Sequence, residues 1–166
     1  MLGLLIADKD AEARNQMANL LIEAGYDIMV TNSAAQAIHG VLNKTTQILL
    51  LGRELNEFTS AELVPLLKKC NRNLMIILVA DDTPLPLMRK VRKEGIFYHA
   101  LRPVEPEGRE EIKQAVKCAI ECLAKTPLGQ KPIECKKSGF LSKYLHLPVP
   151  EVRRKKFSVN HKERSL

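Results

Sequence analysis

Short apolar runs recur along the first hundred residues of this chain, and longer segments of mixed polarity separate them. Each run is four to seven residues long, which suits a strand and is too short for a buried helix. Strands that are apolar throughout are typical of a parallel sheet covered on both faces. The runs lie within residues 4–7, 27–32, 48–51, 74–80 and 96–101.

The segments between these runs have the spacing of amphipathic helices. In the first segment, Ala13, Met17, Leu20 and Leu21 fall on one face of a helix that Asp10 caps and Gly25 ends. Ser33 is a candidate cap for the second helix, and Glu62 is placed for a capping box at the start of the third. The expected helices cover residues 11–24, 33–44, 59–70, 84–95 and 107–124.

Five strands that alternate with five helices predict an α/β fold with a doubly wound, five-stranded parallel sheet. In such sheets, ligands and active sites lie at the carboxyl ends of the strands. This edge is therefore where any functional site is expected. Its predicted residues are Asp8, Lys9, Asp10, Gly52, Ala80 and Arg102.

Charge divides the 166-residue chain into two parts. Residues 1–124 carry 15 Lys and Arg against 16 Asp and Glu, whereas residues 125–166 carry 11 against 3. We therefore expect a near-neutral folded domain over 1–124 and a basic, mostly irregular tail over 125–166, with a short helix favoured near 139–147. No apolar run is long enough to cross a membrane, and no export signal precedes the first strand, which predicts a cytoplasmic protein with its cysteines as thiols.

Four stretches resemble the receiver domains of two-component response regulators, over about residues 1–124. They are LLIADKDAEAR, ILLLGREL, IILVADD and GIFYHALRPVEPE. The resemblance implies a flavodoxin-like fold with strand order 2-1-3-4-5. It also implies a pocket in which an aspartate accepts a phosphoryl group, two acids bind Mg²⁺, and a hydroxyl and a lysine hold the phosphoryl oxygens.

Most of this machinery is replaced in the present sequence. The phosphoacceptor position is Gly52, and of the two metal-binding acids Asp8 remains while Lys9 replaces the other. The hydroxyl position is Ala80, and the lysine position is Arg102, still followed by Pro103; the ring that turns on activation aligns with His99. The resemblance therefore implies a pseudo-receiver that is not an enzyme and uses no metal or other cofactor.

Several interpretations of this pocket remain open. Asp8 either pairs with the cation of Lys9 or Arg102, which would hold the rim in one arrangement, or lies in a relaxed pocket without a signal. Asp10 is either a helix cap or a metal ligand, and Glu54 is expected to be solvated on a loop. A phosphorelay that uses an unconventional carboxylate is a further alternative.

Two surfaces are candidates for partner binding. Receivers often meet partners, or a second copy of themselves, through the fourth helix, the fifth strand and the fifth helix. The fourth helix here carries Arg89, Lys90, Arg92 and Lys93, which either dock an acidic partner or form a solvated face. His99 beside this face is either a pH sensor or a packed, hydrogen-bonded side chain.

The tail is the second candidate surface. It combines an apolar patch with a basic cluster, and we expect it to bind a protein partner, with nucleic acid or an anionic membrane surface as alternatives. The sequence thus favours a non-enzymatic signalling module that acts through phosphorylation-independent protein contacts, or else a nucleic-acid-associated regulator. The tail residues concerned are Phe140, Leu141, Tyr144, Leu145, Arg153, Arg154, Lys155 and Lys156.

Overall fold

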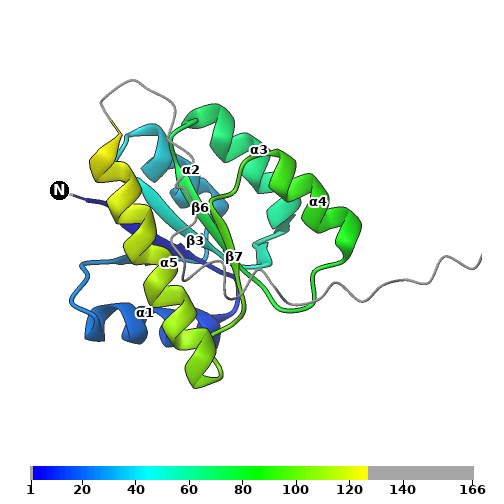
Figure 1. Cartoon of the computed structure of the whole chain (residues 1–166). Coiled ribbons are helices and arrows are strands. Elements are labelled where there is room, and N and C mark those ends of the chain that lie inside the picture. The colour runs from blue at the N-terminus through cyan, green and yellow to red at the C-terminus, as the bar shows by residue number, and fades with distance from the viewer. Residues whose placement is uncertain (1, 127–166) are drawn as a thin grey trace, which may run out of the picture. The chain divides into compact units, whose positions relative to one another are not determined.

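Five parallel strands form the central sheet in the computed structural model, which describes residues 2–126 (Figure 1). Their spatial order is β2-β1-β3-β6-β7, which is 2-1-3-4-5 when only the strands of this sheet are counted. The doubly wound fold class is therefore confirmed. The strands are β1 (Leu4–Ala7), β2 (Met29–Thr31), β3 (Ile48–Leu51), β6 (Met75–Val79) and β7 (Tyr98–Ala100).

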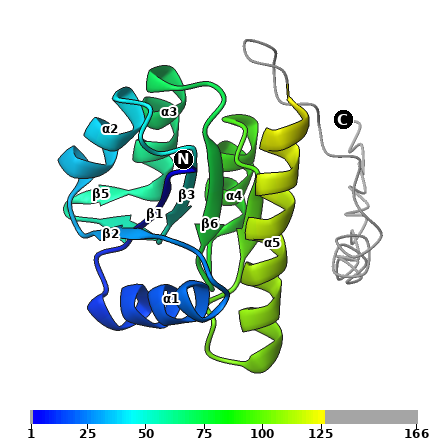
Figure 2. The same cartoon turned by 90° about the vertical axis from the view of Figure 1, so that its left-hand side faces the viewer.

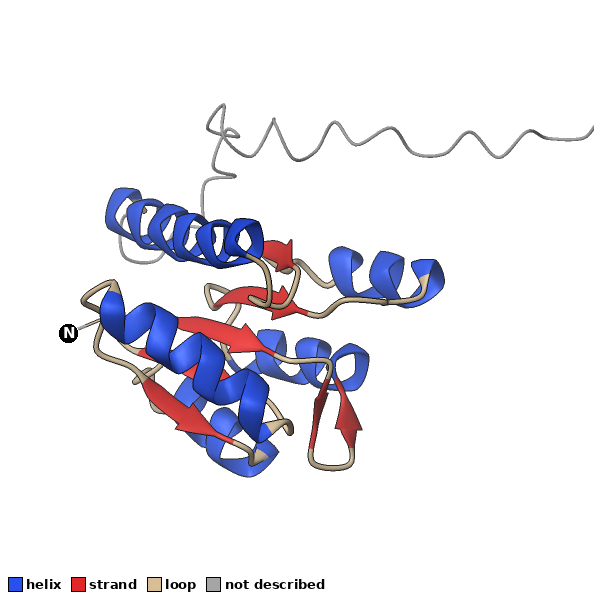
Figure 3. Cartoon of the chain, turned by 90° about the horizontal axis from the view of Figure 1, so that it is seen from below, coloured by secondary structure: helices blue, strands red, loops and turns tan. Residues whose placement is uncertain are grey.

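Helices cover both faces of this sheet (Figures 2 and 3). Two helices contact each other on one face, and three pack side by side on the other. The first face carries α1 (Ala11–Glu23) and α5 (Pro106–Lys125); the second carries α2 (Ala34–Leu42), α3 (Ser60–Cys70) and α4 (Leu85–Lys93).

The helix ends follow the capping chemistry expected from the sequence. The Asp10 side chain accepts from the backbone N–H groups of Glu12 and Ala13, which satisfies donors that the first turn of α1 leaves free. Glu62 accepts from the backbone N–H of Thr59 at 2.8 Å, as in a capping box. Gly25 follows α1 with a positive φ of 87°, a conformation that glycine adopts without strain.

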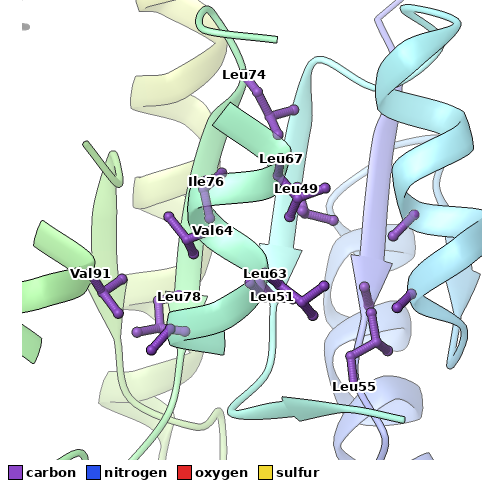
Figure 4. Packing of buried hydrophobic residues seen from close by; sticks show 14 of the residues in the cluster. Leu49, Leu51, Leu55, Leu63, Val64, Leu67, Leu74, Ile76, Leu78 and Val91 are labelled. Atoms are coloured by element: carbon purple, nitrogen blue, oxygen red, sulfur yellow. The ribbon is translucent and has the colours of Figure 1, made fainter. Parts of the chain in front are cut away.

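The core lies in two layers because successive side chains of each strand point to opposite faces. Leu49, Leu51, Ile76 and Leu78 pack with residues of α2, α3 and α4, including Leu63, Val64 and Leu67 (Figure 4). Ile48, Leu50 and Ile77 alternate with them and are fully buried as well. Burial on both faces explains why these strands are continuously apolar in sequence.

A small hairpin follows β3 where the sequence predicts a loop. It consists of β4 (Glu54–Leu55) and β5 (Phe58–Thr59), paired antiparallel. Leu55 is buried, while the turn residue Asn56 has a positive φ of 54°. Two-residue strands are too short to show a period in sequence, so no pattern could have predicted them.

The second part of the chain mostly falls outside the described residues. Helix α5 continues to Lys125, so a domain boundary at 124 stays a prediction, and the calls on Phe140–Leu145 and Arg153–Lys156 lie in the undescribed range. Within residues 2–126, no helix is long and apolar enough to span a membrane. Cys70 is a free thiol, as expected.

Candidate functional site at the carboxyl ends of the strands

Gly52 lies directly after β3, and the side chain of Asp8 fills the space that a side chain on residue 52 would need. The backbone N–H of Gly52 donates to the carbonyl of Ala7 at 2.8 Å, which holds it against the end of β1. A Cβ atom on residue 52 would lie 2.1 Å from Asp8 Oδ2 and 2.2 Å from Asp8 Cγ. Such contacts are far inside van der Waals distance, so residue 52 must be glycine while Asp8 keeps this position.

Asp8 is a buried carboxylate with one satisfied oxygen and one unsatisfied oxygen. Its side chain is almost fully enclosed, at 3% exposure, and Oδ1 accepts from the backbone N–H of Asp10 at 2.9 Å. Oδ2 is buried without a hydrogen-bond partner among the described residues. Burial raises the pKa of Asp8, although the hydrogen bond from Asp10 and the charge of Arg102 act in the opposite direction.

Arg102 connects two loops of the rim through a pair of carboxylates. Its Nη1 lies 3.1 Å from Asp10 Oδ2, and its Nε lies 3.9 Å from Asp81 Oδ2. Its backbone N–H also donates to Asp81 Oδ1 at 2.9 Å. We call Asp10, Asp81 and Arg102 the arginine clasp, because they join the loop after β1 to the loop after β6.

Asp10 contacts Arg102 in the arginine clasp and also caps helix α1. The backbone N–H groups of Ala13 and Glu12 lower the pKa of Asp10, and its contact with Arg102 lowers it further. Asp10 is therefore ionised over a wider pH range than an ordinary aspartate, and the role as a cap predicted for it is confirmed.

Lys9 and Glu54 form a second link across the rim. Lys9 Nζ lies 3.8 Å from Glu54 Oε2, and the backbone N–H of Lys9 donates to the carbonyl of Glu54 at 3.0 Å. Arg14 supports the same loop, because its Nη1 donates to the carbonyls of Asp8 and Lys9. Glu54 is solvent-exposed, as expected, but it lies on β4 rather than on a loop and has a cationic partner.

The predicted ion pair between Asp8 and a cation is not formed. Arg102 pairs with Asp10 and Asp81, and Lys9 pairs with Glu54. The physical reason is burial, since the carboxylate of Asp8 points into the protein whereas both cations lie at the surface of the rim. Whether the pocket carries a signal stays a prediction; the loops around it are linked by the two ion-paired contacts.

The remaining pocket positions lie beside the clasp. Ala80 is buried, and its carbonyl oxygen lies 2.8 Å from His99 Nε2, so this histidine is packed and hydrogen-bonded. Pro103 is buried, and its carbonyl accepts from Arg109 Nε at 3.3 Å. A shallow hollow of about 160 Å³ is left at the surface, lined by Arg53, Ala80, Asp81, Asp82 and Arg102.

The structure brings together most of the residues expected at this edge and adds three more. Asp8, Lys9, Asp10, Gly52, Ala80 and Arg102 all lie at or next to the carboxyl ends of strands, as predicted. Sequence reasoning missed the roles of Asp81, Glu54 and Arg14. Asp81 could have been found, because it comes two residues after the end of β6 on the same edge of the sheet.

The chemistry open to this arrangement is limited by what surrounds residue 52. There is no side chain at that position to attack phosphorus, and the neighbouring carboxylate of Asp8 is enclosed. Among residues 2–126, no three His, Cys, Asp or Glu side chains are grouped so that they could hold a metal ion. Asp8, Asp10 and Asp81 are aspartates at this edge of the sheet. Asp10 and Asp81 already contact Arg102, so they are not available together as metal ligands.

The predicted docking residues of α4 are placed on the outside of the domain. Arg89, Lys90, Arg92 and Lys93 are all exposed, while Met88 and Val91 of the same helix are buried. We call these four exposed cations the basic face of α4.

Comparison with known proteins identifies the fold as that of receiver domains. A receiver domain protein (CheY-like) from Methanospirillum hungatei JF-1 matches with a TM-score of 0.66 at 18% identity, over 76% of this chain and 100% of that one. The receiver domain of NtrX from Brucella abortus matches with a TM-score of 0.63 at 15% identity, over 71% and 98%. At such identities the likeness establishes the fold.

A curated relative also matches part of this chain. The DNA-binding transcriptional regulator NtrC of Rhizobium meliloti (strain 1021) is 22% identical over 102 residues, which is 61% of this chain and 21% of that protein. The chain thus spans about a fifth of the length of the curated relative it matches. No family model matches the chain.

Proposed function

We propose that this protein is a signalling module of the response-regulator type that acts by binding another protein and does not accept a phosphoryl group. The observation that carries the proposal is the position of the Asp8 carboxylate, which fills the space where the side chain of residue 52 would stand. A receiver needs a nucleophile at that point. Here the space is occupied by a carboxylate that is itself enclosed.

The ion-paired rim supports a module with one fixed arrangement. In receivers, by resemblance, the hydroxyl and the lysine grip the phosphoryl group, and that grip drives the conformational switch. In this chain, Arg102 joins the loops after β1 and β6, and Lys9 joins the loop after β1 to the hairpin after β3. The loops are thereby linked through charges that the protein itself carries, so no phosphoryl group is needed to link them.

The basic face of α4 is the proposed contact surface for a protein partner. Its four exposed cations, Arg89, Lys90, Arg92 and Lys93, favour an acidic surface on that partner. The module is proposed to be non-enzymatic. A cytoplasmic location belongs to the same proposal.

Incubation with acetyl phosphate and Mg²⁺, followed by intact-mass spectrometry, tests the proposal. We expect no gain of phosphoryl mass on the full-length protein, whereas a receiver with a complete pocket, run in parallel, gains it. Peptide fragmentation then covers Asp8, Asp10 and Glu54 individually. A phosphoryl group on any of these carboxylates would overturn the proposal and favour the phosphorelay alternative.

Nucleic-acid binding is the second candidate function, and one observation favours it. Residues 125–166 contain 11 Lys and Arg against 3 Asp and Glu, enough positive charge to attract a polyanion. Binding of this kind weakens steeply between about 50 and 200 mM salt, because it releases counterions. Retention of a DNA or RNA probe that falls away over this range for the full chain, and is absent for residues 1–126, would support this function.

A further inference from the structure

The two edges of the central sheet differ in how their outer strands are covered. At one edge, Tyr98 and His99 of β7 are half-buried, and Tyr98 Oη donates to Glu111 of α5 at 2.7 Å. At the other edge, Met29 and Val30 of β2 are 47% and 53% exposed. Adjacent strand residues point to opposite faces, so β2 is open on both faces of the sheet.

The region around β2 is depleted of charge and carries further exposed apolar side chains. Across residues 15–43 only Glu23 and Asp27 are charged, although 27% of the whole chain is charged. Ile22 in the last turn of α1 and Leu42 at the end of α2 are 57% and 56% exposed. Both helices flank β2 (Figure 2), and depletion of charge with retention of apolar area is typical of protein interfaces.

The β2 edge also lacks the features that normally keep an outer strand from pairing. Edge strands are usually protected by Lys, Pro or a bulge, because their outward backbone N–H and C=O groups can pair with another strand. Residues 28–31, Ile-Met-Val-Thr, contain neither a charge nor a proline. On one side β2 pairs with β1, with Met29 opposite Leu5 and Val30 opposite Ile6. No other described strand borders it on the outer side.

We propose that the β2 edge is a self-association surface, on which a second copy of this chain pairs its own β2 antiparallel across a twofold axis. The sequence of the strand is complementary to itself in that arrangement. With Met29 opposite Met29 of the other copy, on the twofold axis, Ile28 lies opposite Val30, and Asp27 lies opposite Thr31. Apolar side chains therefore meet apolar side chains, and each carboxylate faces a threonine rather than a second carboxylate.

The size of the surface sets the expected strength of the dimer. The strand has three residues, so Ile22 and Leu42 must contribute for the contact to approach the ~800 Å² per partner of a stable interface. We therefore expect a reversible dimer whose dissociation constant is in the micromolar range. Its formation is independent of phosphorylation and of the basic face of α4.

Sedimentation equilibrium on the full-length protein over a wide concentration range tests the surface. We expect dimers in the wild type and, for Val30→Lys, a dissociation constant raised at least about tenfold, since a charge would enter the apolar seam. Leu85→Lys is the matched control, because Leu85 is an exposed leucine on α4, at 71% exposure, and away from β2. Circular dichroism checks that both variants fold.

Two cysteine substitutions test the antiparallel register. Met29→Cys places two thiols opposite each other on the twofold axis, within the Cα separation of about 4.4–6.8 Å that a disulfide spans, and should cross-link two chains through residue 29 under mild oxidation. Val30→Cys lies opposite Ile28 of the other copy and should not cross-link through residue 30, as peptide mass mapping checks. A wild-type chain that is monomeric up to several hundred micromolar overturns the proposal. So does a dimer that Leu85→Lys disrupts and Val30→Lys leaves intact, or one in which the two cysteine variants cross-link alike.

Discussion

The rim of this domain has a buried half and an exposed half, and the two differ in how their polar groups are partnered. The buried half contains Asp8, Gly52 and Ala80, where the phosphoacceptor and the hydroxyl expected from the resemblance are missing. The exposed half contains the arginine clasp and the Lys9–Glu54 pair, where charges have found partners. The buried half has no side chain at residue 52, and ion pairs link the loops in the exposed half.

Two aspartates two residues apart show the physical basis of this difference. Asp8 is enclosed, has an oxygen without a partner, and has a raised pKa. Asp10 is at the surface, accepts two backbone N–H groups, contacts Arg102, and has a lowered pKa. Burial disfavours the charged form and hydrogen bonding favours it, so the pKa values of two chemically identical side chains are shifted in opposite directions.

The largest expected effect comes from placing a side chain at residue 52. Gly52→Ala puts a Cβ atom 2.1 Å from Asp8 Oδ2, so the carboxylate must leave its position. We expect Gly52→Ala to lower the free energy of unfolding by about 2–3 kcal/mol, as overpacking does, and Gly52→Asp to lower it further through like charge. Urea denaturation of both variants measures this.

A double-mutant cycle provides the control for this prediction. In an Asp8→Ala background the colliding carboxylate is gone, so Gly52→Ala should cost at least about 1 kcal/mol less than in the wild type. Strictly additive costs would show that Asp8 is not what excludes a side chain from position 52.

The next largest effect concerns the charge of Asp8, and here the substitution should stabilise the domain rather than destabilise it. Because its pKa is raised above the value of 3.8 for a free aspartate, the folded state binds this proton more tightly than the unfolded state does. Stability should therefore rise as the pH falls from 7 through the raised pKa. Asp8→Asn removes this dependence and should stabilise the domain at pH 7 by about 1 kcal/mol, since an unsatisfied buried charge is lost.

Denaturation curves at closely spaced pH values measure this trend and the low pH at which it ends. Asp10, Glu62 and Glu110 have lowered pKa values, so their contributions are lost as the pH falls through those values. The wild type should thus be most stable at mildly acidic pH. If Asp8→Asn keeps the same pH profile between neutrality and that maximum, Asp8 is not the group that titrates.

The sequence predicts the two halves of the rim unequally. The buried half follows from strand ends, because a continuously apolar run must stop where the chain reaches the edge of the sheet, and this placed Asp8, Gly52 and Ala80 together. The pairing in the exposed half does not follow. Arg102 meets Asp10 from 92 residues away, and a choice among Asp8, Asp10 and Asp81 depends on depths of burial that no local pattern encodes.

The hairpin after β3 was unpredictable for the same kind of reason. Its strands have two residues each, and its position is fixed by long-range contacts such as the bond from the Lys9 N–H to the Glu54 carbonyl. Leu55 alone carries a signal, as a single apolar residue between polar neighbours. One buried leucine is insufficient to distinguish a hairpin from a loop.

A smaller effect is expected from opening the arginine clasp. Arg102→Lys keeps the charge but cannot reach Asp10 and Asp81 at once, because a lysine has one ammonium group where arginine has a planar fork. We expect its melting temperature to fall by no more than a few degrees and amide exchange near Asp81–Thr83 to accelerate. Arg53→Ala, which changes another cation lining the same hollow, is the control and should leave that exchange unchanged.

The smallest effect is expected at the pair of Lys9 and Glu54. The two groups are 3.8 Å apart, and their side chains are 63% and 49% exposed. Exposed pairs of this kind contribute less than about 0.5–1 kcal/mol and are screened by salt. Lys9→Ala should therefore change the free energy of unfolding by less than about 0.5 kcal/mol.

A backbone hydrogen bond also joins Lys9 to Glu54, in addition to the ion pair of their side chains. That bond is independent of the side chain, so the hairpin should stay docked in Lys9→Ala, and amide exchange at Lys9 measures this directly. Protection retained in the variant means that the main chain holds this side of the rim and the ion pair only adds to it. Loss of protection would mean that the side-chain ion pair is what holds the hairpin to the loop after β1.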